Sequence, residues 1–361
     1  MKKIVTVLGA RPQFIKAAVL SRLIRSREDF TEVMVHTGQH FDDNMSDIFF
    51  RELDIPDVAY NLEVNGKGHG AMTGQMMEKL EPVMEFEKPD LVVVYGDTNS
   101  TLAGALVASK MNIPVAHVEA GLRSYNMSMP EEINRILTDR ISDLLFCPTQ
   151  QAVSNLEKEG FKSFDVRVVK TGDIMKDSVS FFKVRLEVSD SLARLGVSSN
   201  GFILATIHRQ ENTNSKKQLR SIFEGLESLS KDLPVVLPLH PRTRAAMKEF
   251  DLVSQIKLIE PVGYREMQQL LHHCAMVITD SGGLQKEAYF HKKPCLVLRE
   301  QTEWVELTEA GLARLVGSEA GEIRKAYDAF SQSDLNFGDD LYGTEPGESI
   351  YKEIVDYLNL A

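Results

Sequence analysis

Short apolar, β-branched runs alternate with helical patterns along this chain, in two separate sets. The first set predicts strands at Lys3–Leu8, Glu32–Thr37, Leu91–Tyr95, Val115–Val118 and Leu144–Cys147. The second set predicts strands at Phe202–Thr206, Pro234–Leu239, Lys257–Glu260, Met276–Thr279 and Cys295–Leu298. Short apolar strands separated by helices are typical of parallel sheets covered on both faces. The pattern therefore predicts an α/β protein with two Rossmann-like, doubly wound domains.

A polar turn at Lys170-Thr171-Gly172-Asp173 separates the two sets. We therefore expect an N-terminal domain at residues 1–170 and a second domain at residues 171–349. With 361 residues, the chain is long enough for two domains with cores of their own. Residues 331–349 are rich in Asp, Gly, Asn and Pro and predict a loop. We expect the last helix, within residues 350–361, to pack back on the first domain.

Composition narrows the range of partners and locations. The net charge of -11 argues against nucleic acid or an anionic membrane as the main partner. No run approaches the ~20 apolar residues of a membrane span, and the first apolar run ends at Gly9, too early for a signal peptide. The three cysteines are widely spaced and predict buried, reduced thiols. We expect a cytoplasmic protein.

Ligands of doubly wound sheets bind beyond the carboxyl ends of the strands, and two facing domains place the site in the cleft between them. One strand is followed by Ser281-Gly282-Gly283 and then a helical pattern. Free N–H groups at the start of that helix, together with its dipole, favour a phosphate or diphosphate. Glu287, one turn further, is placed to accept hydrogen bonds from ribose hydroxyls. The alternative is an ordinary tight turn.

The first predicted strand ends in Gly9-Ala10-Arg11-Pro12. This is not the G-x-G-x-x-G fingerprint, so a nicotinamide or flavin dinucleotide is disfavoured, and we expect no cofactor. Arg11 lies at a helix start, where it can clamp a phosphate, and Lys16 adds charge one turn on. The alternative for Arg11 is a solvated loop residue.

Acidic residues follow neighbouring strands of the first domain. Asp97 and Glu119 each follow a predicted strand, and Glu131 follows Pro130 at a helix start. Carboxylates packed together raise at least one pKa by mutual repulsion, which suits a proton carrier. Helix capping is the competing explanation for Asp97 and Glu131, but it does not apply to Glu119.

Histidines follow two strands of the second domain, as His208 and His240, which suggests electrostatic support or proton transfer. Arg242 follows His240 in the segment His240-Pro241-Arg242-Thr243. His36 and His40 have a spacing that suits a metal on a helix, but His36 is predicted on a strand. No Glu or Cys completes that pair, so we predict no metal site.

These segments together resemble the non-hydrolysing UDP-N-acetylglucosamine 2-epimerase family. The matching pieces occur in the family's order and cover most of the chain: GARPQFIK, TGQH, YGDTNST, HVEAGLRS, MPEEINR, HRQEN, LHPRT, DSGGLQKEA and TEWVE. The resemblance implies two glycosyltransferase-B-type domains, an active site in their cleft, a C-terminal helix crossing back to the first domain, and a homodimer.

The resemblance also implies roles for residues. Asp97, Glu119, Glu131 and His208 form the implied catalytic set. Arg11, Ser281, Gly282 and Gly283 hold the diphosphate, and Glu287 holds the ribose. The remaining implied binding residues are Lys16, Gln39, His40, Arg135, His240 and Arg242.

The implied chemistry explains why several carboxylates are needed. The C2 hydrogen of a 2-acetamido sugar is not beside a carbonyl, so its direct removal gives no stabilised carbanion. Anti elimination of UDP from C1, with removal of the C2 proton, avoids that problem and leaves a 2-acetamidoglucal. Return of the proton from the other face, with re-addition of UDP, inverts C2. This requires an acid or base on each ring face and cations around the leaving diphosphate.

Two departures from the common pattern bear on regulation and substrate. Family members that UDP-GlcNAc activates carry a further glutamine shortly after the TGQH motif, but His40-Phe41-Asp42-Asp43 has none, so the resemblance does not imply allosteric activation here. The TEWVE segment replaces the commoner Thr-Glu-Arg-Pro-Glu and is similar to a branch that acts on UDP-2,3-diacetamido-2,3-dideoxy-glucuronate for surface polysaccharides. UDP-GlcNAc and this uronate both remain candidate substrates.

Three other functions fit the same fold. A retaining glycosyltransferase would transfer the sugar to an acceptor and needs no clustered acids. A hydrolysing relative would release UDP irreversibly. A nucleotide-sugar sensor would bind UDP and leave the C2 proton in place.

Overall fold

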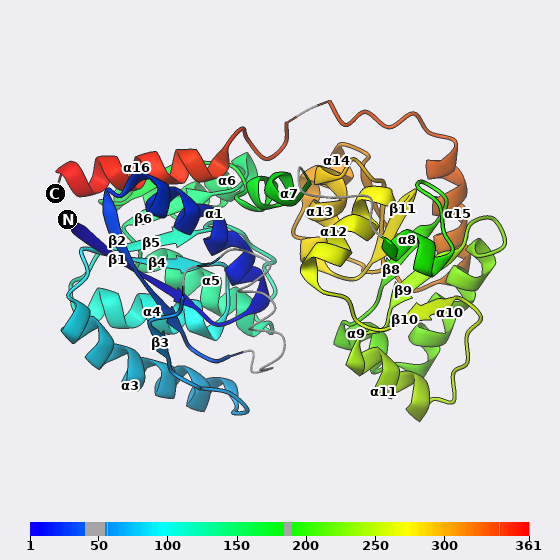
Figure 1. Cartoon of the computed structure of the whole chain (residues 1–361), viewed down its shortest axis with the longest axis horizontal. Coiled ribbons are helices and arrows are strands. Elements are labelled where there is room, and N and C mark those ends of the chain that lie inside the picture. The colour runs from blue at the N-terminus through cyan, green and yellow to red at the C-terminus, as the bar shows by residue number, and fades with distance from the viewer. Residues whose placement is uncertain (40–54, 56, 184–189, 339, 361) are drawn as a thin grey trace. The chain divides into compact units, whose positions relative to one another are not determined.

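The computed structural model describes residues 1–39, 55, 57–183, 190–338 and 340–360. The chain divides into two compact units, which we describe separately. Unit 1 comprises Met1–Ser178 and Leu341–Ala361, and unit 2 comprises Val179–Asp340. Figure 1 labels the elements of both units.

Unit 1 is built on a seven-stranded parallel sheet with the order β3-β2-β1-β4-β5-β6-β7. Its strands are β1 Lys2–Leu8, β2 Phe30–His36, β3 Tyr60–Asn61, β4 Leu91–Tyr95, β5 Val115–Val118, β6 Leu144–Cys147 and β7 Arg167–Lys170. Its helices are α1 Arg11–Arg27, α3 His69–Glu87, α4 Asn99–Lys110, α5 Pro130–Arg140, α6 Gln150–Lys158, the first turn of α7 Met175–Lys183, and α16 Pro346–Leu360, with a short 3₁₀ turn at Phe161–Ser163.

Unit 2 repeats this plan on a six-stranded sheet with the order β10-β9-β8-β11-β12-β13. Its strands are β8 Ile203–Thr206, β9 Val235–Pro238, β10 Lys257–Ile259, β11 Met276–Thr279, β12 Cys295–Val297 and β13 Ala313–Leu315. Its helices are α8 Asp190–Leu195, α9 Gln210–Thr213, α10 Lys216–Leu229, α11 Pro241–Glu249, α12 Tyr264–His273, α13 Gly282–Phe290, α14 Val305–Glu309 and α15 Ala320–Ser331.

All strand pairs in both sheets are parallel, and both strand orders reverse beside the first strand, as doubly wound sheets do. The predicted fold class is therefore confirmed. Central strands such as β4 and β6 are buried along their whole length, which explains their continuous apolar sequence. In unit 2, α10 and α15 pack together over the sheet and share one apolar core with β8, β11 and β12.

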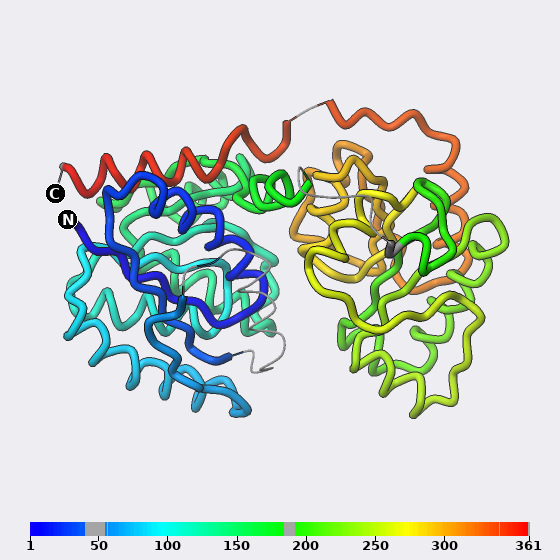
Figure 2. Tube along the Cα trace, in the orientation of Figure 1, coloured from blue at the N-terminus to red at the C-terminus, as the bar shows by residue number. Residues whose placement is uncertain are grey.

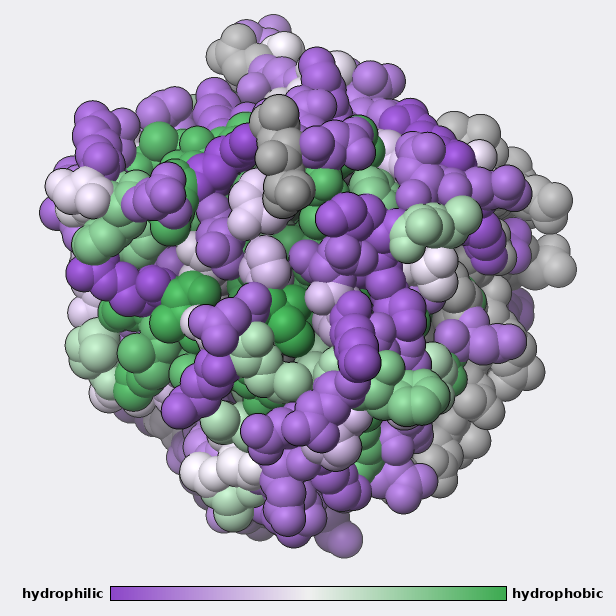
Figure 3. All heavy atoms as spheres, turned by 90° about the vertical axis from the view of Figure 1, so that its left-hand side faces the viewer, coloured by the Kyte–Doolittle hydropathy of each residue, from purple (hydrophilic) through white to green (hydrophobic). Residues whose placement is uncertain are grey.

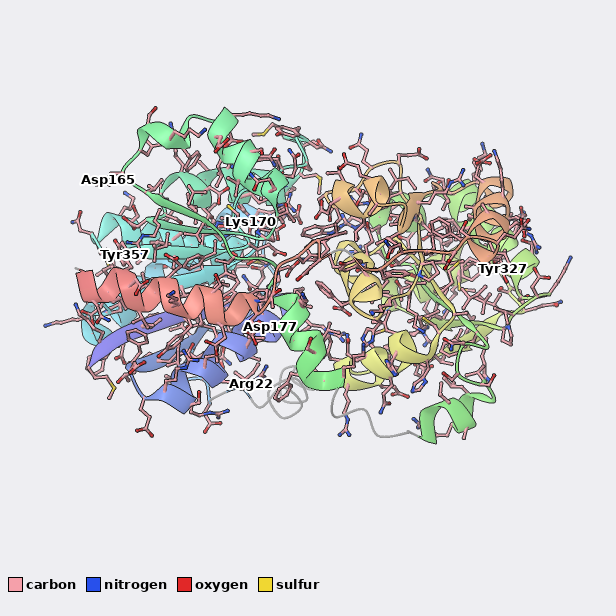
Figure 4. All side chains as sticks on the ribbon, turned by 90° about the horizontal axis from the view of Figure 1, so that it is seen from above. Arg22, Asp165, Lys170, Asp177, Tyr327 and Tyr357 are labelled. Atoms are coloured by element: carbon pink, nitrogen blue, oxygen red, sulfur yellow. The ribbon has the colours of Figure 1, made fainter. Side chains whose placement is uncertain are left out.

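The division between the units differs from the boundaries expected at 170/171 and 349/350. It falls within α7, because the first turn of that helix is bonded to unit 1. Ser178 Oγ donates to the carbonyl of Ile15 (3.3 Å), and Asp177 accepts from the backbone N–H of Gly347 (2.7 Å). Figure 4 shows Asp177 at the meeting point of α7 and α16. The division into units therefore lies later in the chain than the polar turn at residues 170–173.

The C-terminal segment returns to unit 1 and ends in α16, which packs against α1. Figure 2 shows this red segment running beside the blue start of the chain. Arg27, at the end of α1, pairs with Glu348 (2.6 Å), and its guanidinium stacks over the ring of Tyr351 (4.6 Å). The helix begins at Pro346, so the loop predicted over 331–349 is shorter than expected.

The surface and the cysteines show ordinary features. On the face of the molecule in Figure 3, hydrophilic side chains cover most of the surface, with hydrophobic ones between them. Among the helices that the structure describes, none is long and apolar enough to cross a membrane. Cys147, Cys274 and Cys295 are free and buried, as predicted.

Candidate functional site

The turn between β1 and α1 is fastened to the end of β4 by one glutamine. The side-chain oxygen of Gln13 accepts from the backbone N–H groups of Gly9 (2.8 Å) and Ala10 (2.9 Å). Its amide group donates to the carbonyl of Tyr95 (2.7 Å). Arg11 is the first residue of α1 and is partly exposed, so it lies at a helix start as expected and not in an open loop.

The predicted binding residue Gln39 lies against the start of α4. Its side-chain oxygen accepts from the Ser100 hydroxyl (2.8 Å) and backbone N–H (3.1 Å), and that hydroxyl also bonds Thr37 (2.8 Å). Gln39 therefore supports the β2 and β4 loops at one edge of the sheet. His40, the next predicted residue, is outside the described residues.

Glu119 follows β5 and contacts the ammonium group of Lys16 from α1. Both side chains are about nine-tenths buried, with exposures of 8% for Lys16 and 11% for Glu119. The backbone of Glu119 has φ +76°, a left-handed conformation that is strained for a residue with a side chain. A strained, buried carboxylate paired with one lysine is an arrangement found at functional sites.

Asp97, at the end of the neighbouring strand β4, pairs with Arg135 of α5. It does not cap α4, because the capping residue is Thr98, whose hydroxyl accepts from the N–H of Thr101. Asn134 of α5 donates to the backbone carbonyl of Asp97 (2.9 Å). Helix capping therefore does not account for the acidic residue at position 97. The hydrogen bond from Asn134 joins α5 to the end of β4.

Arg135 also donates to Glu132 (3.0 Å), a fully buried residue that sequence reasoning missed. Burial acts to raise the pKa of Glu132, but the N–H groups of Ser124 and Tyr125, with Arg135, outweigh it and hold the pKa below its usual range. Glu131, the predicted acid, is exposed in the first turn of α5. The PEEINR segment thus places the buried carboxylate of Glu132 on Arg135, next in sequence to the exposed carboxylate of Glu131.

In unit 2, the carboxylate of Asp280 joins the ends of β8 and β11. It is fully buried and accepts from the backbone N–H groups of His208 and Arg209 and from the side chain of Asn212, each at 3.0 Å. Sequence reasoning named its neighbours but not Asp280. This residue fixes the turn that carries His208.

His208 and His240 lie side by side, with ring centroids 5.5 Å apart. Burial, together with Arg209 and Arg242, lowers the pKa of His208 although Asp280 opposes the shift. Burial and His208 likewise lower the pKa of His240. Arg242 donates to the carbonyl of His208 (2.9 Å). The structure therefore brings together these three predicted residues, with both imidazoles kept neutral near pH 7.

The Ser281-Gly282-Gly283 loop begins α13 as predicted, with Ser281 in the capping position. Two residues that sequence reasoning missed support it. The indole N–H of Trp304 donates to the carbonyl of Gly282 (3.0 Å), and the ammonium group of Lys286 lies over the indole ring (3.8 Å). This helix start is the predicted anion-binding element. The N–H of Ser281 donates to the hydroxyl of Thr279 (2.9 Å).

Glu287 is 7% exposed and accepts from the side chain of Gln268 (2.8 Å), whose oxygen in turn faces His291 Nε2 (2.8 Å). Burial and neighbouring cations lower the pKa of His291 to about 3, so it is neutral and Nε2 donates. The predicted ribose-binding carboxylate is therefore oriented by two residues of unit 2. Within the described residues, no group of three or more His, Cys, Asp and Glu side chains is placed to hold a metal ion.

Known proteins share both the sequence and the fold. The family model described as UDP-N-acetylglucosamine 2-epimerase matches residues 22–352. The chain is 51% identical over 357 residues to the UDP-2,3-diacetamido-2,3-dideoxy-D-glucuronate 2-epimerase of Pseudomonas aeruginosa, covering 99% of both chains. It is 41% identical over 365 residues to the UDP-N-acetylglucosamine 2-epimerase of Methanocaldococcus jannaschii, covering 97% and 98%.

Solved structures give the same result. The M. jannaschii enzyme in complex with UDP-GlcNAc and UDP has a TM-score of 0.88 and 39% identity, covering 99% of this chain and all of that one. The Neisseria meningitidis UDP-GlcNAc 2-epimerase bound to UDP-GlcNAc has a TM-score of 0.85 and 31% identity, with coverage of 99% and 100%.

Proposed function

Because the chain belongs to the UDP-N-acetylglucosamine 2-epimerase family, we propose that it reversibly inverts C2 of a UDP-2-acetamido sugar without hydrolysing it. The observation that carries this proposal is the pairing of two carboxylates with cations at adjacent strand ends. Glu119 pairs with Lys16, and Asp97 pairs with Arg135. A retaining glycosyltransferase has no use for these acids beside the sugar.

We assign the sugar chemistry to unit 1 and the UDP chemistry to unit 2. Removal of the C2 proton on one ring face and its return on the other require two acid/base groups, which Asp97, Glu119 and Glu131 supply. The leaving diphosphate needs fixed donors, which the start of α13 supplies. The neutral imidazole of His208 is able to donate a hydrogen bond or accept a proton at that diphosphate.

We propose UDP-2,3-diacetamido-2,3-dideoxy-glucuronate as the preferred substrate. The 51% identity to an epimerase named for that sugar supports it, against 41% for one named for UDP-GlcNAc. UDP-GlcNAc is the second candidate, because solved structures of similar fold hold it. The uronate would serve the synthesis of surface polysaccharides.

The test is to incubate the protein with each UDP-sugar in buffered water and follow the anomeric proton signals by NMR. A mixture of gluco and manno forms, reached from either side, is the expected result, and the uronate should give the larger kcat/KM. Stoichiometric free UDP with a free sugar would instead identify a hydrolysing enzyme. An unchanged sugar that is transferred when an acceptor is added would identify a glycosyltransferase.

We further propose that the protein works as a homodimer in the cytoplasm. A groove of about 440 Å³ over α3, α4 and α5 is lined in part by Met77, Pro130 and Ile133. Ile133 and Leu137 expose 40% and 44% of their surface on α5. Light scattering should give twice the mass of the 40.5 kDa chain, and replacing Leu137 with Glu should shift the protein toward monomer.

A further inference from the structure

The strained backbone of Glu119 is held from both sides by hydrogen bonds. Glu119 and Ala120 both donate their N–H groups to the carbonyl of Phe146 (3.1 and 3.0 Å). Two residues on, Gly121 also has a positive φ, +78°. A residue with a side chain adopts this conformation only when its surroundings enforce it.

Beside this turn lies a buried chain of three residues, which we call the Asp139 network: His117, Asp139 and Arg123. His117 and Asp139 are fully buried, and His117 Nδ1 lies 2.7 Å from Asp139 Oδ1. Arg123 lies 2.7 Å from Asp139 Oδ2 and forms a double hydrogen bond with Glu159 (2.7 and 2.8 Å). Burial acts to raise the pKa of Asp139, but His117 and Arg123 outweigh it and keep this carboxylate ionised.

The network ends on the backbone of the two turns that carry the proposed catalytic acids. His117 Nε2 faces the carbonyl of Gly96 (2.7 Å), the residue before Asp97. Because the carboxylate of Asp139 only accepts hydrogen bonds, Nδ1 of His117 donates to it. Asp139 Oδ2 also accepts the N–H of Gly121 (3.1 Å). One carboxylate thus bonds residues two positions before and two positions after Glu119.

We propose that Asp139 is a positioning residue that holds Glu119 in its left-handed conformation and so sets its contact with Lys16. A buried ion pair is weak evidence for stability alone. Here its hydrogen bonds converge on two strand-end turns, which suits fixing geometry. The catalytic consequence rests on the proposed function, but the conformational claim does not.

The first test is the crystal structure of Asp139→Asn. A neutral amide loses the ion pair with Arg123, and it keeps its bond to His117 only if Nδ1 of that ring gives up its proton. We expect φ of Glu119 to leave the left-handed region and its Lys16 contact to be lost. An unchanged φ and an intact contact would overturn the proposal, whether or not the protein is an epimerase.

The second test is kinetic. Asp139→Asn should lower kcat by roughly 10²-fold, as expected for a misplaced reacting group. Its affinity for UDP should stay within about two-fold of the parent, because the residues of unit 2 are untouched. The matched control is Glu159→Gln, which breaks the outer pair with Arg123 but has no contact with either turn. It should keep kcat within about two-fold even where it lowers stability.

A double-mutant cycle separates positioning from a purely structural role. In a Glu119→Gln background, Asp139→Asn should lower the remaining activity no further, because its effect acts through Glu119. Equal fractional losses in both backgrounds would overturn the proposal. If Asp139→Asn does not fold, His117→Gln is used instead. It removes the hydrogen bond between His117 and Asp139 and leaves the one between Gly121 and Asp139. It should give the same change in φ and the same non-additive loss, and additive losses would again overturn the proposal.

Discussion

At the residue scale, Arg135 is the group on which the pairing of Asp97 depends. Its two terminal nitrogens bond different carboxylates, Asp97 and Glu132. A lysine carries the same charge but cannot form both bonds in one plane. We therefore expect Arg135→Lys to lower kcat by roughly 10²-fold, with UDP affinity nearly unchanged.

Steady-state kinetics with UDP binding by calorimetry checks this prediction. The matched control is Arg140→Lys on the same helix, whose guanidinium stacks over Phe164 (3.9 Å) outside the site. It should keep kcat within about two-fold. Equal losses in the two variants would mean that the bond to Asp97 has no special role.

The strand-end positions of some proposed site residues were predictable from sequence, because the end of a parallel strand fixes where the next side chain lies. Asp97, Glu119 and His208 belong to this group. Their supporting partners were not predictable. Asp139 bonds a histidine 22 positions away, and Trp304 bonds a carbonyl 22 positions away, so no local pattern indicates either contact.

At the scale of elements, the turn after β5 depends on a glycine for two separable reasons. Gly121 has φ +78°, and a Cβ there would lie 2.5 Å from the carbonyl oxygen of Ala152 in α6. Gly160 has φ +84° with no atom within 4 Å of such a Cβ. It therefore serves as a control for backbone strain alone.

Chemical denaturation of the two alanine variants should separate these reasons. Gly160→Ala should lower the free energy of unfolding by about 1–2 kcal/mol, the price of a left-handed residue with a side chain. Gly121→Ala should lower it by about 1–3 kcal/mol more, because the added methyl displaces α6 from the strand end. Equal losses in the free energy of unfolding of the two variants would show that α6 moves away from the added methyl group at no measurable cost.

Three strands escaped prediction, β3, β7 and β13, and all lie at sheet edges. β3 has two residues, and β7 and β13 keep exposed or half-buried side chains, so neither shows a continuous apolar run. Strands buried on both faces must be apolar throughout, whereas edge strands need not be. The central part of each sheet was therefore predictable, whereas of the four edge strands only β10 was predicted.

At the scale of the whole molecule, unit 2 should lose stability in acid. The pKa values of five of its histidines are lowered, in each case first by burial: His208, His240, His272, His273 and His291. Unfolded, each binds a proton near pH 6.5. The unfolded state thus binds more protons below that pH. This stability is fully present above about pH 6.5 and is lost as the pH falls, for His291 toward about 3.

The one tryptophan of the chain makes this measurable. Trp304 belongs to unit 2 and is 4% exposed, so its fluorescence reports the unfolding of that unit. The urea midpoint followed by this signal should be lower at about pH 5.5 than at about pH 7.5. His291→Gln should reduce the difference between the two midpoints. A midpoint that does not change with pH would contradict the role of the buried histidines.

Epimerisation by elimination and re-addition of UDP requires that the C2 proton of the sugar leaves and returns. The direct measurement is the proton NMR spectrum of the UDP-sugar incubated with this protein in D₂O. We predict that the C2 proton signal disappears while a manno anomeric signal grows, because the proton is returned from solvent-exchanged groups. A C2 proton that persists while UDP still binds would contradict the epimerase function and the roles given to Asp97, Glu119 and Glu131.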